Sequence, residues 1–207
     1  MSSPLLLATR SEGKLRELRP LFAAAGMSVI DLVSARIAPS AEEDALEQFE
    51  TFEENALAKA HYFLARSGLA TVADDSGLEV TTLNGAPGVR SKRFSARVDL
   101  SGQALDDANN AALLAALAFK TDRSARYVCA AAYVDWTSGF AVRGESTGRV
   151  LAEGRGANGF GYDPFFLSDE LGMTFGEATR ERKEAISHRG RAFRALCDAL
   201  RSREKPR

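Results

Sequence analysis

The stretch Ala73-Asp74-Asp75-Ser76-Gly77 places two adjacent carboxylates, a hydroxyl and a glycine between two strand-like runs. Residues 69–73 are apolar, and residues 78–83 alternate apolar and polar side chains as a half-buried strand does. Since Asp, Ser and Gly are common turn formers, we predict a turn here, with the acidic pair at a strand end. Neighbouring strand residues point to opposite faces, so the two carboxylates cannot serve one pocket alike unless the chain turns between them. We expect one to be chemical and one structural.

Length and composition indicate one globular domain. The chain has 207 residues, of which 45% are hydrophobic and 27% charged, and this is enough for one sizeable core. We therefore expect residues 1–207 to form a single domain, alone or with a second lobe. The formal net charge is −1, so the molecule as a whole gives no reason to expect a nucleic-acid duplex as its partner.

The two cysteines, Cys129 and Cys197, lie in apolar or helical patterns, and neither has a partner at metal-ligand spacing. Both are expected to be buried thiols of a protein in a reducing compartment. The N-terminal run is too short for the core of a signal peptide, and no apolar run approaches the length of a membrane span. We therefore expect a cytoplasmic protein that does not enter a membrane.

A polar hexad, Thr9-Arg10-Ser11-Glu12-Gly13-Lys14, follows an apolar run at residues 4–8 that is typical of a buried strand. Apolar residues then recur at helical spacing from Leu15 to Phe22, so the hexad is predicted to lie at a strand-to-helix junction. A helix N-terminus offers backbone N–H groups and a positive dipole end to an anion. The alternative is an ordinary helix cap with solvated charges. Pro20 is expected to kink this helix or to begin a new segment.

The next two segments differ in character. Residues 39–48 are acidic, and such runs are usually solvated faces. Thr51 then opens a capping-box pattern, which predicts a helix that ends at Gly68. Asn55 and Lys59 share one face of that helix because they are four residues apart, and a buried face would normally reject both. The alternative is that this face is in contact with solvent.

The remaining segments alternate loops with regular elements. Residues 84–93 form a glycine- and proline-rich loop with three cations, and residues 107–119 are predicted to form a helix. Two long antiparallel strands are predicted at residues 126–136 and 140–151. Residues 177–203 are helical in composition with a basic first half, and an interruption is expected at the glycine of position 190.

These pieces together indicate nucleotide chemistry. Cations gather in the hexad, in the loop at residues 84–93 and at the start of the C-terminal segment, while carboxylates gather at residues 42–47 and 74–75. A polyphosphate held by cations and backbone N–H groups, with Mg²⁺ held by carboxylates and phosphate oxygens, would use both sets. The glycine and aromatic turn at residues 159–162 offers a face on which a base can stack. We therefore expect a nucleoside triphosphate as a small-molecule substrate.

Other catalytic patterns are missing from the sequence. It contains no Gly-x-x-x-x-Gly-Lys-Ser/Thr phosphate loop, and no Gly-x-Gly-x-x-Gly follows the first predicted strand. A Ser-His-Asp triad is disfavoured because no Gly-x-Ser-x-Gly elbow is present. With two histidines and no clustered cysteines, the sequence also argues against a zinc site.

Six motifs, in order along nearly the whole chain, resemble the inosine triphosphate pyrophosphatase family, also described as dITP/XTP pyrophosphatases. They are Leu7-Ala8-Thr9 with Lys14, and residues 51–56, 73–78, 85–88, 159–164 and 185–190. The resemblance implies an α/β fold, a long mixed β-sheet flanked by helices in two lobes with a central substrate cleft. It also implies Mg²⁺-dependent hydrolysis of dITP, ITP or XTP to the monophosphate and pyrophosphate, by a homodimer that cleanses the nucleotide pool.

The resemblance further implies roles for single residues. Asp75 would be the catalytic carboxylate, which binds metal and accepts the proton of the attacking water, and Glu47 would be the second metal ligand. The hexad Thr9 to Lys14 and Lys59 would hold phosphates, and Ser76 would touch the substrate. The residues expected around the base are Phe160, Gly161, Tyr162, Asp163, Lys183, His188 and Arg189.

Two positions depart from the usual pattern of that family. Arg10-Ser11 stands where Gly-Asn usually precedes the lysine, so a shorter hydroxyl replaces an amide near the phosphates. Phe49 stands two residues after Glu47, where a glycine is usual, and this leaves Glu43 open as the alternative metal ligand.

Alternatives to this enzyme remain open. The basic loop and the pair Phe160 and Tyr162 also suit a module that binds nucleotides or single-stranded RNA without hydrolysis. An enzyme of the same shape could instead prefer another base, such as a modified pyrimidine. A keto oxygen at purine C6 accepts a hydrogen bond where adenine offers an amino donor, so donors in the pocket are expected to select for it.

Overall fold

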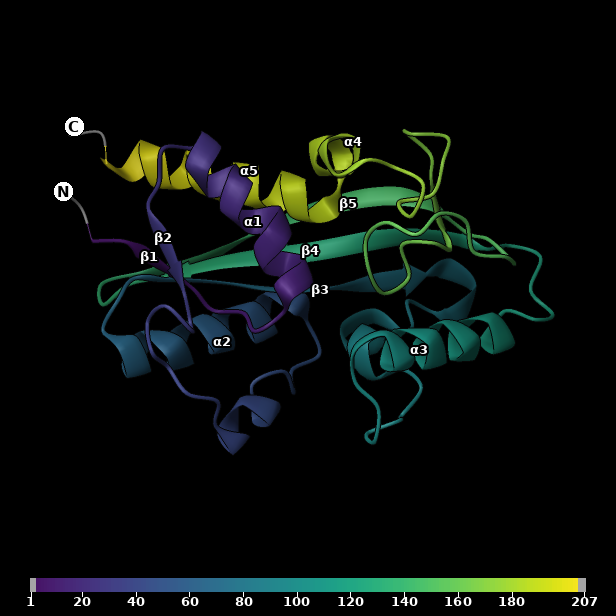
Figure 1. Cartoon of the computed structure of the whole chain (residues 1–207), viewed down its shortest axis with the longest axis horizontal. Coiled ribbons are helices and arrows are strands. Elements are labelled where there is room, and N and C mark those ends of the chain that lie inside the picture. Colours follow the sequence, from purple (N-terminus) through teal and green to yellow (C-terminus); the bar gives the residue numbers. More distant parts are fainter. Residues whose placement is uncertain (1–2, 205–207) are drawn as a thin grey trace. The chain divides into compact units, whose positions relative to one another are not determined.

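The computed structural model describes residues 3–204, and within them it contains one six-stranded sheet and five α-helices (Figure 1). The strands are β1 (Leu5–Leu7), β2 (Val29–Asp31), β3 (Thr71–Val80), β4 (Ser124–Val134), β5 (Gly139–Val150) and β6 (Phe166–Ser168). The α-helices are α1 (Glu12–Ala24), α2 (Phe52–Ser67), α3 (Gly102–Ala116), α4 (Arg180–Ile186) and α5 (His188–Glu204). Short 3₁₀ helices are η1 (Ala41–Ala45), η2 (Thr81–Leu83) and η3 (Gly88–Arg93).

The sheet is mixed, with the strand order β2-β1-β3-β4-β5-β6. Strand β1 pairs in parallel with β2 and with β3, whereas β6 pairs antiparallel with β5. Strands β4 and β5 are neighbours joined by residues 135–138, a connection short enough for an antiparallel hairpin. The Asp135 N–H closes that turn by donating to the carbonyl of Ser138 at 2.9 Å. The predicted mixed sheet flanked by helices is thus confirmed.

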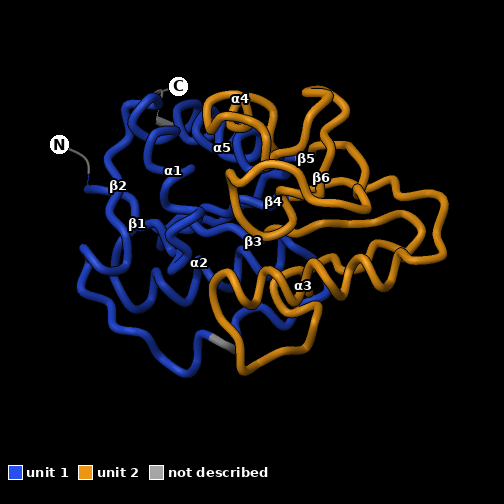
Figure 2. The backbone as a smooth tube through the Cα atoms, turned by 45° about the vertical axis from the view of Figure 1, so that its right-hand side comes forward, with its two compact units in different colours: residues 1–75, 129–144, 188–207 blue, residues 76–128, 145–187 orange. Residues whose placement is uncertain are grey.

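The chain divides into two compact units (Figure 2). Unit 1 comprises residues 1–75, 129–144 and 188–207, and unit 2 comprises residues 76–128 and 145–187. In unit 1, α1 and α5 lie on one side of the strands and α2 lies on the other (Figure 1). In unit 2, α3 and α4 lie on opposite sides of the strands (Figure 1).

Each unit has its own hydrophobic core. In unit 1, α1 packs on α5, and the rings of Phe22 and Phe193 meet edge to face with centroids 5.8 Å apart. In unit 2, Tyr127 stacks on Phe175 with centroids 5.7 Å apart, and Phe166 packs against both rings. Phe22 and Phe193 lie in segments whose helical periodicity predicts a buried face, whereas Phe175 lies between β6 and α4, outside any regular element.

The predicted turn at the acidic pair is wrong, because β3 runs without interruption from Thr71 to Val80. Gly77 keeps an ordinary strand conformation and is not among the described residues with positive φ. The physical reason is that each carboxylate has partners on its own face of the strand, as described below. The chain therefore needs no turn to bring them to solvent.

Two helix predictions also change. No new segment begins at Pro20, because helix α1 continues through it, and Leu18, Leu21 and Phe22 around it are buried in the unit 1 core. The break in the C-terminal helical segment falls at Ser187, where the backbone is extended, and not at Gly190. By contrast, Thr51 caps the start of α2, and Gly68 ends it in a left-handed conformation with φ +72°, as predicted.

The structure also bears on the two cysteines and on membrane-spanning helices. Cys129 and Cys197 are free and buried, as expected. Within the described part of the chain, none of the helices combines the length and the apolar character that crossing a membrane requires.

Candidate active site

The two adjacent carboxylates of β3 face opposite sides of the sheet, as strand alternation requires. Asp74 faces α1 and α5, where its Oδ2 lies 3.0 Å from Lys14 Nζ and accepts from Arg189 Nε at 3.3 Å. Burial alone would raise the pKa of Asp74, but the two cations outweigh it and hold that pKa well below the usual range. The surroundings of Asp74 therefore favour its ionised form.

Helix α1 completes this cluster with a second carboxylate. Arg189 Nη1 donates to Glu17 Oε2 at 2.6 Å, so the guanidinium joins Asp74 and Glu17. Only 2% of Arg189 is exposed, and its neighbour His188 is 3% exposed. Both residues were expected near the base, yet in unit 1 they form part of a buried ionic cluster and its surroundings.

Asp75 faces α2, and its surroundings are the reverse of those of Asp74. Its Oδ2 accepts from Asn55 Nδ2 at 2.9 Å, and the residue is 5% exposed. Burial, followed by the negative charge of Glu47, raises the pKa of Asp75 from 3.8 to about 6. The ammonium groups of Lys14 and Lys59 lower this pKa without reversing the shift. A carboxylate that resists ionisation in this way is a candidate proton acceptor near neutral pH.

Lys59 connects the pieces of this site. It forms an ion pair with Glu47, and its Nζ donates to the backbone carbonyl of Asp74 at 2.9 Å. Burial would lower the pKa of Lys59, but the charges of Glu47, Asp74 and Asp75 raise it above the ordinary value. On this face of α2, Asn55 is buried and Lys59 is half-buried, so the face is polar and mostly shielded from solvent.

Glu43 and Glu47 occupy different surroundings. Glu43 accepts from Arg10 Nε and Nη2, each at 2.7 Å, and Arg66 lies 3.4 Å from the same carboxylate. It also closes the capping box of η1 by accepting from the Ser40 N–H at 3.1 Å. Glu43 is therefore saturated by cations, whereas the charge of Glu47 acts on Asp75.

The polar hexad lies where a strand-to-helix junction was predicted. Ser11 is the N-cap of α1, and its Oγ accepts from the Lys14 N–H at 3.4 Å, while Thr9 Oγ1 accepts from the Ser11 N–H at 3.2 Å. Glu12 and Gly13 form the first turn of the helix. The predicted cap is therefore present. Thr9 and Asp74 also line the same small hollow of unit 1.

The departure at Phe49 has a simple structural consequence. Asn55 contacts only backbone atoms of Phe49: the Phe49 N–H donates to Oδ1 at 2.9 Å, and Nδ2 donates to the Phe49 carbonyl at 3.3 Å. The phenyl ring itself is 47% exposed. The contact therefore does not depend on which side chain stands at position 49.

The donor set at Glu47 and Asp75 suits a divalent cation. The negative charge of Glu47 raises the pKa of Asp75, and a bound cation would reduce the repulsion between the two carboxylates. Among the described residues, no group of three or more His, Cys, Asp or Glu side chains is arranged to hold a metal. A site with two protein carboxylates fits Mg²⁺, which keeps several waters and takes other oxygens from phosphates.

A second polar cluster lies in unit 2. Lys183 Nζ donates to Asp163 Oδ2 at 2.6 Å and lies 5.2 Å from the centre of the Phe160 ring. The Phe160 N–H donates to the same Asp163 oxygen at 2.8 Å. A Cβ at Gly159, whose φ is +77°, would stand 2.0 Å from that oxygen, so glycine is required there. Asp163 therefore fixes both an ammonium and an aromatic ring.

Helix α3 holds the next residue of this turn from the other side. The Gly161 N–H donates to Asp106 Oδ2 at 2.8 Å, and Asn110 Nδ2 donates to the Gly161 carbonyl at 3.0 Å. Tyr162 is 5% exposed and donates its O–H to the Ser91 carbonyl at 2.8 Å, within the unit 2 core. Its ring thus packs in the core, which leaves Phe160 as the half-buried ring of the pair.

The sequence interpretation assigned no role to several polar residues of these clusters, namely Glu17, Asn55, Asp106 and Asn110. Asn55 carried a signal, because it shares a helix face with Lys59 in a motif that was recognised. The other three carried none. They lie in helices whose apolar periodicity explains their positions without a site.

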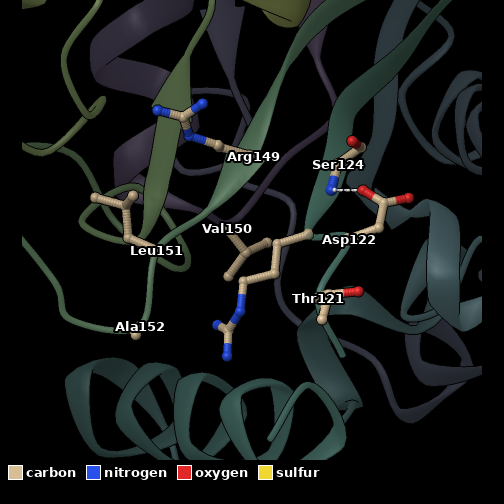
Figure 3. Close-up of a pocket in the computed structure, with 8 residues that line it drawn as sticks. Thr121, Asp122, Ser124, Arg149, Val150, Leu151 and Ala152 are labelled. Carbon is tan, nitrogen blue, oxygen red and sulfur yellow. Dashed lines mark hydrogen bonds between the residues drawn. The ribbon is translucent and has the colours of Figure 1, made fainter. Parts of the chain in front are cut away.

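A hollow of about 350 Å³ in unit 2 is lined by residues 121–124 and 149–152 (Figure 3). Figure 3 shows the Ser124 N–H donating to Asp122 Oδ1, at 2.8 Å, on one side of it. None of the predicted site residues lines this hollow, and its only carboxylate is already bonded in a local turn. The carboxylate and lysine cluster of β3 and α2 is therefore the candidate site.

Comparisons with known proteins identify the family of this chain. The sequence profile of the Ham1 family matches residues 5–199. The chain is 48% identical over 209 residues to a dITP/XTP pyrophosphatase of Mycolicibacterium paratuberculosis, covering 99% of both chains. It is 50% identical to one of Frankia alni, covering 95% of this chain and 96% of the relative.

A solved structure extends the likeness to the fold. The HAM1 protein of Coxiella burnetii superposes with a TM-score of 0.83 at 32% identity, covering 97% of this chain and 100% of that one. Both the sequence profile and the relatives span nearly the whole chain, so the resemblance that the six motifs indicated is confirmed. The chain belongs to the Ham1 family.

Proposed function

We propose that this protein hydrolyses dITP, ITP and XTP to the nucleoside monophosphate and pyrophosphate. The observation that carries the proposal is Asp75, a buried carboxylate with a pKa raised to about 6, beside Glu47 and two lysines. Membership of the Ham1 family, with relatives named dITP/XTP pyrophosphatase, supports the same reaction and substrate class.

Unit 1 supplies the residues for the phosphates in this proposal. The first turn of α1, from Thr9 through Gly13, offers hydroxyls and backbone N–H groups, and Lys14 and Lys59 add ammonium groups. Arg10 joins them through the same junction, although its guanidinium is held by Glu43. Each lysine also faces a carboxylate, so the phosphates would compete with existing ion pairs for these cations.

Glu47 and Asp75 are the proposed ligands of Mg²⁺. The ion pairs of Glu43 with Arg10 and Arg66 favour Glu47 over Glu43 for this role. When bound, Mg²⁺ would supply positive charge that screens the triphosphate. Lys59 would keep the Glu47 carboxylate in place through its ion pair.

Asp75 is the proposed proton acceptor. A water attacks the α-phosphorus, its proton passes to the Asp75 carboxylate, and the bond between the α-phosphorus and the bridging oxygen breaks. The products are the nucleoside monophosphate and pyrophosphate, so one water is consumed for each triphosphate. Ser76, the next residue of β3 and only partly buried, is proposed to touch the substrate beside this group.

The proposed base-recognition residues lie in unit 2, except His188 and Arg189, which lie in unit 1. Lys183, held by Asp163, offers a donor for the C6 oxygen, and Phe160 offers a ring on which the base stacks. Gly161 allows the backbone to approach closely, and Tyr162 supports the turn from the core. His188 and Arg189, at the start of α5, complete the set that the family resemblance implies.

The domain organisation, the localisation and the oligomeric state are also proposed. We expect residues 1–207 to work as one two-lobed domain, in a cytoplasmic homodimer that cleanses the nucleotide pool. Analytical ultracentrifugation checks the homodimer, since a monomer at working concentrations would exclude it.

The test is a panel of nucleoside triphosphates assayed for pyrophosphate release with and without Mg²⁺. We expect release from dITP, ITP and XTP that depends on the metal, and far slower release from ATP and modified pyrimidine triphosphates. A nucleotide- or RNA-binding module would instead bind with strong salt dependence and release nothing. Diphosphate and orthophosphate as products would contradict the proposed bond cleavage.

A further inference from the structure

Asn55 is the most completely buried polar side chain beside the proposed catalytic carboxylate, with 0% of the residue exposed. Its amide makes three hydrogen bonds. Nδ2 donates to Asp75 Oδ2 at 2.9 Å and to the Phe49 carbonyl at 3.3 Å, and Oδ1 accepts from the Phe49 N–H at 2.9 Å. Both donor hydrogens and the acceptor are therefore used.

These bonds join two segments that carry the proposed metal ligands. Asp75 lies on β3, and Phe49 lies two residues after Glu47 in the loop that leads into α2. Because one planar amide holds both, the position of the Glu47 loop is tied to that of the Asp75 carboxylate. Lys59, one turn further along α2, ties Glu47 from its other side.

We propose that Asn55 is a positioning residue, which orients the Asp75 carboxylate and holds the Glu47 loop at the spacing that binding Mg²⁺ requires. This inference rests on the proposed function for its link to turnover. The amide acts through Asp75 and Glu47 and takes no part in the reaction itself.

The amide suits this position better than other side chains do. A lysine would bring a third ammonium to a site whose carboxylates must attract a cation. An aspartate would add a like charge beside Asp75 and would lose both donors. A leucine of similar size would leave Asp75 without this donor and the buried backbone groups of Phe49 unpaired.

The chain provides a matched control in Asn109 of α3, which is 3% exposed. Its Oδ1 accepts from the Ser95 N–H at 2.8 Å, and its Nδ2 donates to the Lys92 carbonyl at 3.0 Å. Like Asn55, Asn109 therefore joins a loop to a helix through one backbone N–H and one backbone carbonyl. Unlike Asn55, it makes these bonds to backbone groups without a bond to any of the described carboxylates. A loss of the clamp alone is thus separable from a loss of the Asp75 contact.

The experiment compares Asn55→Ala with Asn109→Ala in the full-length protein. Mg²⁺ is titrated calorimetrically without nucleotide, and kcat and KM for dITP are measured separately. We expect both variants to melt earlier, but only Asn55→Ala to weaken Mg²⁺ binding and lower kcat, each by about 10–100-fold, as for other residues that orient metal ligands. KM for dITP is expected to change less than kcat.

Equal Mg²⁺ affinities in the two variants, or no Mg²⁺ binding by the wild type, would overturn the inference. If Asn55→Ala does not fold, Asn55→Ser is used with Asn109→Ser as its control. Pyrophosphate release by the wild type reports on the proposed function separately, because the calorimetric comparison needs no turnover.

Discussion

Replacing each of the two adjacent aspartates by asparagine is expected to change stability in opposite directions. The folded-state pKa of Asp75 is raised from 3.8 to about 6, so its ionised form is less stable in the folded protein than in the unfolded chain. Below about pH 4 the carboxyl is protonated in both states and has no such effect. As the pH rises past 6, ionisation of Asp75 lowers the free energy of unfolding by its full amount. Asp75→Asn removes that cost.

The magnitude follows from the size of the shift. A change of roughly two pKa units corresponds to about 3 kcal/mol at about 1.4 kcal/mol per unit. Asp75 is nearly buried, so solvent screens little of this cost. For a chain of this length, 1 kcal/mol moves Tm by about 2–4 °C, so Asp75→Asn is expected to raise Tm by about 6–12 °C at neutral pH.

Asp74→Asn is expected to do the opposite. The pKa of Asp74 is held below its usual range by Lys14 and Arg189, so its ionised form stabilises the folded protein at every pH above the unfolded value. The substitution leaves both cations short of a buried partner, and breaking such a cluster costs about 3–5 kcal/mol. Arg189 keeps its bond to Glu17, which limits the loss.

The assay is urea unfolding of the wild type and both variants, with a chelator present, at several pH values between 4 and 8. The advantage of Asp75→Asn should be near zero at pH 4 and grow to its full size above pH 7. Added Mg²⁺ should narrow it, because a ligand that binds the folded wild type stabilises it. Loss of stability in Asp75→Asn, or an advantage that does not depend on pH, would refute this reasoning.

Three further predictions concern activity. Asp75→Asn is expected to lower turnover of dITP by orders of magnitude while nucleotide binding, measured by calorimetry, largely survives; unchanged turnover would remove Asp75 as the proton acceptor. Gly159→Ala is expected to displace Asp163 and to raise KM for ITP. Gly172 also has a positive φ but has open space around it, so Gly172→Ala should lower only stability. Equal KM values for the two variants would contradict a role of Asp163 in substrate binding. Lys59→Met is expected to release Glu47 from its ion pair and to lower kcat. If the variant keeps the kcat of the wild type at every Mg²⁺ concentration tested, the ion pair is dispensable.

Much of the fold was predictable from local pattern. The strand and helix periodicities located the long helices and the hairpin strands β4 and β5, and the caps at Thr51 and Gly68 fixed the ends of α2. The family resemblance gave meaning to the acidic pair and to the two glycine-rich segments. Several short motifs in a fixed order are specific to a family, whereas each residue taken alone is not. It also separated Asp75 from Asp74, which residue alternation alone cannot do.

What failed depended on partners far along the chain. Residues 74–77 have the composition of a turn, and only contacts from Lys14 and Arg189 on one face and Asn55 on the other explain why β3 stays extended. The burial of Tyr162 follows from a bond to Ser91, 71 residues away, which no local pattern encodes. Likewise, the helix break at Ser187 and the uninterrupted course of α1 through Pro20 follow from tertiary packing.

The measurement that tests the central claim most directly is hydrolysis of dITP in ¹⁸O-labelled water with Mg²⁺, followed by mass spectrometry of both products. Attack of water at the α-phosphorus predicts one ¹⁸O atom in dIMP and none in pyrophosphate. Label in the pyrophosphate, or formation of dIDP and orthophosphate, would contradict the account.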